Sequence, residues 1–111
     1  MSGSLEFDVP CCYSTRECNA RKLVIIGFRG KPRILRIIHA TRCARGITKK
    51  IKVFPGDIIL VRYYVSNRGV HYITVLWKPQ NITDEQAIRI ARKALGLETE
   101  EKITITTDVL Q

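Results

Sequence analysis

Short runs of apolar residues, separated by turn residues, predict a series of β-strands along most of the chain. The clearest run is Thr48–Phe54, in which Ile51 and Val53 alternate with Lys50 and Lys52. This alternation indicates a strand with one buried face and one cationic face. Four other runs rich in β-branched residues are interpreted as strands for the same reason. The five predicted strands are Lys22–Phe28, Arg33–Ile38, Thr48–Phe54, Ile58–Val65 and Val70–Trp77.

The connections between these runs are short and rich in turn-forming residues. Arg29–Pro32 and Ser66–Gly69 are predicted to be turns. Between the third and fourth strands, Pro55 fixes φ at the first turn position and Gly56 is expected to take the positive φ of the next. Asp57 is then expected to accept hydrogen bonds from local backbone donors. Short connections favour antiparallel neighbours, and five such strands tend to close as a small barrel.

A helical pattern replaces the strand pattern after Pro79. Thr83 and Gln86 have the spacing of a capping box, an apolar stripe follows, and Gly96 has the position of a C-terminal cap. This pattern predicts a helix from about residue 84 to residue 95. Lys102–Thr107 alternates like a strand, which leaves open an edge strand or a loose tail. We therefore expect an N-terminal tail or irregular cover (1–18), a barrel with a trailing helix (19–96) and a C-terminal extension (97–111).

The net charge of +9 is concentrated in one half of the chain. Residues 16–52 contain twelve Lys or Arg and one acid, whereas residues 57–111 contain seven of each. A local excess of this kind indicates a face that meets a polyanion, with RNA or DNA ahead of a membrane surface. The alternative is a solvated basic surface that only maintains solubility. No apolar run approaches the roughly 20 residues that span a bilayer, so we expect no membrane partner. Residues 1–10 have neither the basic nor the apolar region of a secretory signal, and we therefore expect a cytoplasmic protein.

The four cysteines contain no CxxC pair. Because structural disulfides are rare in the cytosol, we expect these residues to be reduced and packed as small hydrophobes. A zinc site is the less favoured alternative, since zinc modules normally contain at least one closely spaced ligand pair. Its candidate ligands are Cys11 or Cys12, Cys18, His39 and Cys43.

Groups for catalysis are few, whereas aromatic residues suited to base stacking are frequent. No phosphate-binding glycine motif occurs, and His39 and His71 are the only histidines. We therefore expect no enzymatic activity and no cofactor. Tyr63 and Tyr64 are adjacent in a predicted strand and must face opposite sides. Only one of these two tyrosines can therefore be buried. The aromatic residues available for stacking are Phe28, Phe54, Tyr63, Tyr64, Tyr72 and Trp77. Of these, the core is expected to take up Phe28, Phe54 and Trp77.

The order of these elements resembles the S1-like OB fold of translation initiation factor 1A. Pro55–Tyr64 ("PGDIILVRYY") is similar to that family's Gly-Asp-apolar-apolar-Leu-Val stretch. Val75–Gln80 ("VLWKPQ") is similar to its Ile-Ile-Trp-Arg-Tyr stretch, and Arg45–Val53 ("RGITKKIKV") to its basic loop before strand three. Asn81–Gly96 falls where eukaryotic members have a helix beyond the barrel. The resemblance covers about residues 19–96.

This resemblance implies a mainly β protein, a five-stranded OB-fold barrel with a C-terminal helix, that binds ribosomal RNA. Its members occupy the decoding-site region of the small ribosomal subunit. The implied partners are that subunit and other initiation factors, and the free protein is expected to be a monomer. The residues expected to contact RNA are Lys31, Arg33, Arg42, Arg45, Gly46, Lys49, Lys50, Lys52, Arg62 and Lys78.

Two other functions remain open at this point. One is an OB-fold module for single-stranded nucleic acid outside translation initiation, which would bind generic oligonucleotides nearly as tightly as ribosomal subunits. The other is a structural subunit of a ribonucleoprotein, stabilised by zinc through the cysteines and His39. Stoichiometric zinc in the purified protein would distinguish this last alternative.

Overall fold

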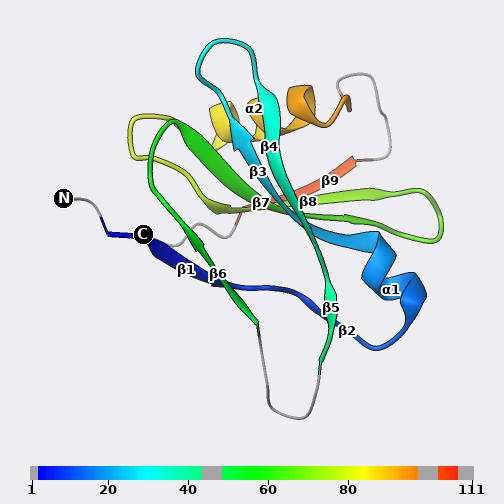
Figure 1. The fold of residues 1–111 in the computed structure, drawn as a ribbon. Helices are drawn as coiled ribbons and strands as arrows, with labels where there is room; N and C mark the ends of the chain where they lie inside the picture. The colour runs from blue at the N-terminus through cyan, green and yellow to red at the C-terminus, as the bar shows by residue number, and fades with distance from the viewer. Residues whose placement is uncertain (1–2, 44–48, 98–102, 108–111) are drawn as a thin grey trace.

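The computed structural model describes residues 3–43, 49–97 and 103–107, the last of these as backbone alone (Figure 1). The described residues form a mainly β fold with one substantial helix near the C-terminus. The elements are β1 (Leu5–Asp8), β2 (Cys11–Cys12), α1 (Thr15–Ala20), β3 (Arg21–Gly27), β4 (Arg33–His39), β5 (Thr41–Arg42), β6 (Lys50–Val53), β7 (Ile58–Val65), β8 (His71–Trp77), α2 (Asp84–Ala94) and β9 (Ile103–Thr107).

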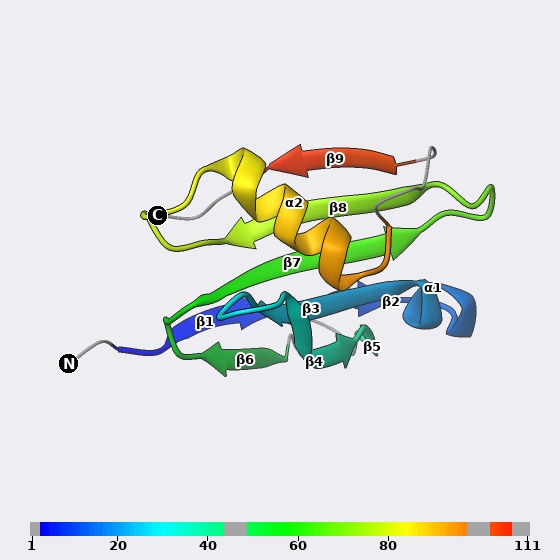
Figure 2. The ribbon, with the colours of Figure 1, turned by 90° about the horizontal axis from the view of Figure 1, so that it is seen from above.

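A twisted sheet with the strand order β4-β3-β7-β8-β9 forms the centre of the molecule (Figure 2). Neighbouring strands pair in an antiparallel manner except for β8 and β9, which are parallel. The parallel pair follows from α2, because a crossover helix between two strands returns the chain in the same direction. Of the two alternatives for Lys102–Thr107, an edge strand or a loose tail, the structure has an edge strand at Ile103–Thr107.

The helix α2 covers one face of this sheet. Three central strands supply fully buried β-branched side chains to the interface, and the helix supplies two alanines, Ala87 and Ala91, that are 0% exposed. Because alanine has a short side chain, the helix axis can approach the sheet closely. The buried strand residues of this core are Val24, Ile26, Ile59, Val61, Ile73 and Val75.

A two-stranded ribbon covers part of the opposite face. Strand β1 pairs with β6 in an antiparallel manner, and Phe7 and Val53 from the ribbon pack on the sheet. The sheet contributes Leu23, Leu60 and Leu76 to this second core. The two cores lie on opposite sides of the same strands, which explains why β3 and β7 read as nearly continuous apolar runs.

The strands do not close into the barrel that the sequence predicted. All five predicted strands are present, but the third, β6, pairs with β1 and belongs to a separate ribbon. Its partner lies in the segment 1–18, which we expected to be a tail or irregular cover. This segment also contains β2 and the first residues of α1. With β6 engaged there, the five-stranded sheet stays open. The mainly β class and the C-terminal helix are confirmed.

The turn predictions are confirmed at the hairpins and wrong at Gly56. Gly30 and Gly69 have φ of 77° and 78° in the β3–β4 and β7–β8 turns, whereas Gly56 does not have a positive φ. Because β6 and β7 do not pair with each other, their connection crosses from the ribbon to the sheet instead of reversing in a tight turn. The Asp57 carboxylate lies 3.9 Å from the Arg29 guanidinium, and both side chains are exposed.

The aromatic predictions have a similar outcome. Phe28 and Trp77 are partly buried against the two cores, as expected. Phe54 is 71% exposed, so its predicted core position is wrong. It follows the last residue of β6, at the end of the ribbon, and no barrel wall encloses it.

The expectation of reduced cysteines is also wrong, because two disulfides fasten the N-terminal segment. Cys11 is bonded to Cys43 and Cys12 to Cys18, with Cα atoms 5.1 and 5.2 Å apart. Both sulfurs of each pair are used, so the zinc alternative loses its ligands. Within the described residues no group of three metal-ligating side chains gathers, and His39 is exposed at the end of β4. No described helix is long and apolar enough to cross a membrane.

Candidate nucleic-acid interface

A row of one arginine and two tyrosines crosses the sheet on the face away from α2. The pairing register places Arg21 of β3 opposite Tyr64 of β7, and Tyr64 opposite Tyr72 of β8. The Arg21 guanidinium carbon lies 5.5 Å from the centre of the Tyr64 ring. The Tyr64 and Tyr72 ring centres are 5.7 Å apart, with 31° between their planes. These three side chains are named the platform below.

Strand alternation explains why the platform faces away from the helix. Tyr63 points to the α2 side, where it packs against the first core and shares a 2.6 Å hydrogen bond with Nδ1 of His71. Tyr64, the next residue, must therefore face the other side. The prediction that these two tyrosines face opposite sides is confirmed.

A second row beside the platform adds a further cation. Arg62 of β7 lies opposite Thr74 of β8 and two residues from Tyr64, so it shares the platform's face. Arg62 is exposed. Beyond this row the same face becomes apolar and passes beneath the ribbon, where Leu60 is fully buried. The polar and aromatic end of the face is therefore the part that the ribbon leaves uncovered.

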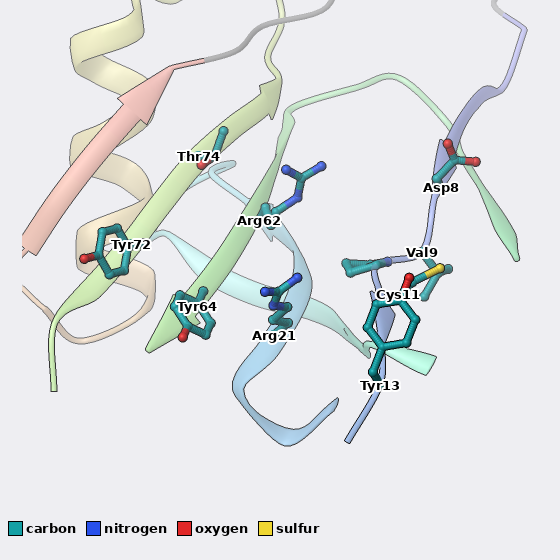
Figure 3. A pocket seen from close by; sticks show the side chains of 10 residues that line it. Asp8, Val9, Cys11, Tyr13, Arg21, Arg62, Tyr64, Tyr72 and Thr74 are labelled. Carbon is teal, nitrogen blue, oxygen red and sulfur yellow. The ribbon is translucent and has the colours of Figure 1, made fainter. Parts of the chain in front are cut away.

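The platform forms one wall of a cavity of about 610 Å³ (Figure 3). The other wall comes from residues 8–18, named the strap below, which contribute Asp8, Val9, Pro10, Cys11 and Tyr13. Figure 3 shows the two sets of side chains on opposite sides of the gap. The strap keeps its position through β2, which pairs with β5, and through the Cys11–Cys43 disulfide.

The lining combines the two kinds of group that single-stranded nucleic acids need. Tyrosine rings offer flat faces on which bases stack, and guanidinium groups pair with phosphate oxygens or stack on bases themselves. Arg21 and Arg62 supply the positive charge, and Asp8 supplies the one carboxylate among the lining residues. Cavities of several hundred Å³ accommodate ligands of nucleotide size.

The structure brings only one of the predicted RNA-contacting residues, Arg62, to this cavity. Arg42 lies nearby on β5, where its guanidinium donates a 3.3 Å hydrogen bond to Oγ1 of Thr15 in α1. Lys31 and Arg33 are exposed at the β3–β4 hairpin, and the Arg33 side chain donates to the carbonyl of Arg29.

The three predicted lysines of the basic segment lie on or beside the ribbon. Lys50 and Lys52 are exposed on β6, opposite Asp8 and Glu6 of β1 in the pairing register. Lys49 is exposed, and its carbonyl accepts a hydrogen bond from the backbone of the strap residue Val9. The outward, cationic face expected for β6 is confirmed.

Lys78 lies shortly before α2, and its side chain is largely buried. Its side chain is 9% exposed, and its ammonium donates to the Ile82 carbonyl at 2.9 Å and lies 3.7 Å from the Asp84 carboxylate. It thus holds the chain at the start of α2. Arg45 and Gly46 lie outside the described residues.

Sequence reasoning missed Arg21 and the role of the strap in the cavity, and it named Tyr72 only among the aromatic residues available for stacking. A signal for Tyr72 was available, because residues paired across a hairpin have numbers that add to a constant. The turn at Ser66–Gly69 with Val65 opposite His71 places Tyr72 opposite Tyr64. No comparable local signal connects the strap to the sheet.

Comparison with models of known protein families, with curated proteins and with solved structures finds no match. The function is therefore inferred from the site itself.

Proposed function

We propose that this protein binds single-stranded RNA on the face of the sheet away from α2, and that it acts by binding alone. The platform is the observation that carries this proposal. Three neighbouring strands present a guanidinium and two tyrosine rings in register, next to a cavity and to a second arginine. Sheet faces with aromatic side chains on adjacent strands bind unpaired bases by stacking.

The charge distribution supports the same proposal. The basic excess of residues 16–52 covers β3, β4, β5 and β6, and β3 carries the platform's Arg21. An RNA strand leaving the cavity would meet further cations on these strands. Phosphate neutralisation adds affinity without sequence preference and makes binding sensitive to salt.

A narrower proposal follows from the resemblance to translation initiation factor 1A. In it, the RNA is that of the small ribosomal subunit near the decoding site, and other initiation factors are partners. The cytoplasmic location belongs to this narrower proposal. Inside cells, structural disulfides such as the two found here persist mainly in hyperthermophiles. The sheet is open, so no closed barrel supports this narrower proposal. Its support is the similarity of the stretch Pro55–Tyr64 to the sequence of that family. Co-sedimentation with small subunits, with free RNA as competitor, tests it.

The broader proposal is tested by titrating fluorescein-labelled RNA of about 12 nucleotides, a length within the site sizes of small β domains. Replacing Tyr64 or Tyr72 by Ala is expected to cost about 1 to 3 kcal/mol of binding free energy, the value of one base–aromatic stack. The corresponding Phe variants keep the ring and are expected to bind nearly as wild type. Phe54→Ala is the matched control, because Phe54 is an exposed aromatic residue outside the cavity.

Salt dependence tests the arginines separately. If Arg62 neutralises one phosphate, Arg62→Ala should reduce the slope of log K against log salt by about 0.7, the value for one contact on a single strand. Arg89→Ala, which removes an exposed charge on α2, should leave the slope unchanged. Equal binding by wild type, Tyr64→Ala and Tyr72→Ala would contradict the proposal.

A further inference from the structure

Tyr13 is the most exposed of the large apolar or aromatic side chains described, at 79%, and it lines the cavity from the strap. A ring with this exposure buries little area on folding and contributes little to stability. The other tyrosines of the cavity, Tyr64 and Tyr72, stand on the opposite wall. The Tyr13 ring can therefore contact a ligand in the cavity from the wall opposite the platform.

The backbone that carries Tyr13 is fixed from two directions, although its ring is exposed. The Cys12–Cys18 disulfide bonds β2 to the short helix α1 and closes a loop between them, and Cys12 is 1% exposed. Within this loop the Tyr13 amide donates to Oε2 of Glu17 at 2.8 Å. The Glu17 amide in turn donates to Oγ of Ser14, the N-cap of α1, at 3.2 Å.

The second disulfide connects the residue before this loop to the end of β5. Cys11 is bonded to Cys43, directly after β5, and β2 pairs with β5 in a parallel manner. The Thr41 amide donates to the Pro10 carbonyl at 3.0 Å. Tyr13 thus directly follows two consecutive cysteines that are each covalently bonded elsewhere, which limits how far the strap can move from the platform.

Resting on the proposed RNA-binding function, we propose that Tyr13 is the second stacking surface of the site. A base on the platform is then held between the sheet and the strap, and the two disulfides keep the Tyr13 backbone at the distance this requires. Preorganisation of this kind lowers the entropy cost of binding, because the protein side of the stack is already ordered. The disulfides are in consequence binding determinants as well as structural bonds.

The test uses the full chain and the same fluorescein-labelled RNA, with both disulfides intact. Tyr13→Ala is expected to raise the dissociation constant about 5- to 150-fold, which is the loss of one base–aromatic stack. Tyr13→Phe is expected to bind within about 2-fold of wild type, because the ring is kept. Tyr13 is exposed, so neither substitution disturbs a core.

The contribution of the strap is measured by comparing oxidised protein with protein reduced by a phosphine. Reduction should weaken RNA binding by wild type and have a smaller effect on Tyr13→Ala, in which the positioned ring is already absent. Circular dichroism on the same samples shows whether the reduced protein keeps its fold. If it unfolds, Glu17→Ala replaces reduction, since it removes the hydrogen bond to the Tyr13 amide and leaves both disulfides in place.

The outcomes separate this inference from the proposal on which it rests. If Tyr64→Ala weakens binding and Tyr13→Ala does not, RNA binding stands and the role of Tyr13 is overturned. If neither substitution weakens binding, the RNA-binding proposal itself fails. A third outcome is that Tyr13→Ala weakens binding, but reduction or Glu17→Ala weakens binding by the Tyr13→Ala variant as strongly as binding by wild type. In that case the disulfides do not act through Tyr13.

Discussion

The two disulfides should differ in what they contribute to stability, because they close loops of different length. Cys11 and Cys43 are 32 residues apart, whereas Cys12 and Cys18 are 6 apart. Loop-closure entropy in the unfolded chain then gives about 3.7 kcal/mol for the first bond and about 2.2 kcal/mol for the second. Replacing both cysteines of a pair by Ala should therefore cost more for Cys11 and Cys43.

Urea unfolding followed by the fluorescence of Trp77 measures this difference. Trp77 is the one tryptophan of the chain and is partly buried against the second core. The Cys12→Ala/Cys18→Ala variant is the matched control, because it also loses two sulfurs and one disulfide. An equal or larger loss in this control, or a loss below about 1 kcal/mol for Cys11→Ala/Cys43→Ala, would refute the loop-length reasoning.

Two further predictions concern the turn after β7 and the start of α2. Gly69→Ala should cost about 1 kcal/mol of unfolding free energy because φ is 78° there, whereas Gly56→Ala should be nearly neutral; urea unfolding of both variants checks this, and equal losses would contradict it. Lys78→Met should cost about 1 to 3 kcal/mol, since the buried ammonium's hydrogen bond to Ile82 and its ion pair with Asp84 are lost. Unchanged stability of Lys78→Met would show that the ion pair does not hold the helix start.

Local sequence signals predicted the elements whose causes are local. The α2 capping box is present, with Thr83 and Gln86 each bonding the other's backbone, and Gly96 has a φ of 72°. The hairpin turns at Gly30 and Gly69 also form where their sequences indicated. In each case the residues that decide the conformation lie within a few positions of one another.

Long-range pairing was not predictable in the same way. The alternation of Lys50–Val53 determines which side of the strand is buried, but it does not say which strand lies beside it. That choice depends on Phe7 and its neighbours, far away in the sequence, which pair with β6. Five strands with short connections therefore predict a barrel. The pairing of β6 with β1 prevents the barrel from closing.

The candidate site was predicted in part for the same reason. Alternation in β7 places Arg62 and Tyr64 on one face, and the basic composition indicated an RNA partner. The platform also needs β3 and β8 in a particular register, and the cavity needs the strap. Four cysteines allow three disulfide pairings, and the pairing of β2 with β5 that brings Cys11 to Cys43 is not visible in the spacing.

The most direct test of RNA binding on the platform is ultraviolet crosslinking of the oxidised protein to single-stranded RNA, with the crosslinked residues identified by mass spectrometry. Crosslinks are expected at Tyr64 and Tyr72, whose rings lie beside each other on the part of the sheet that the ribbon does not cover. Crosslinks confined to Phe54 or to the ribbon, with none at either tyrosine, would contradict RNA binding on the platform.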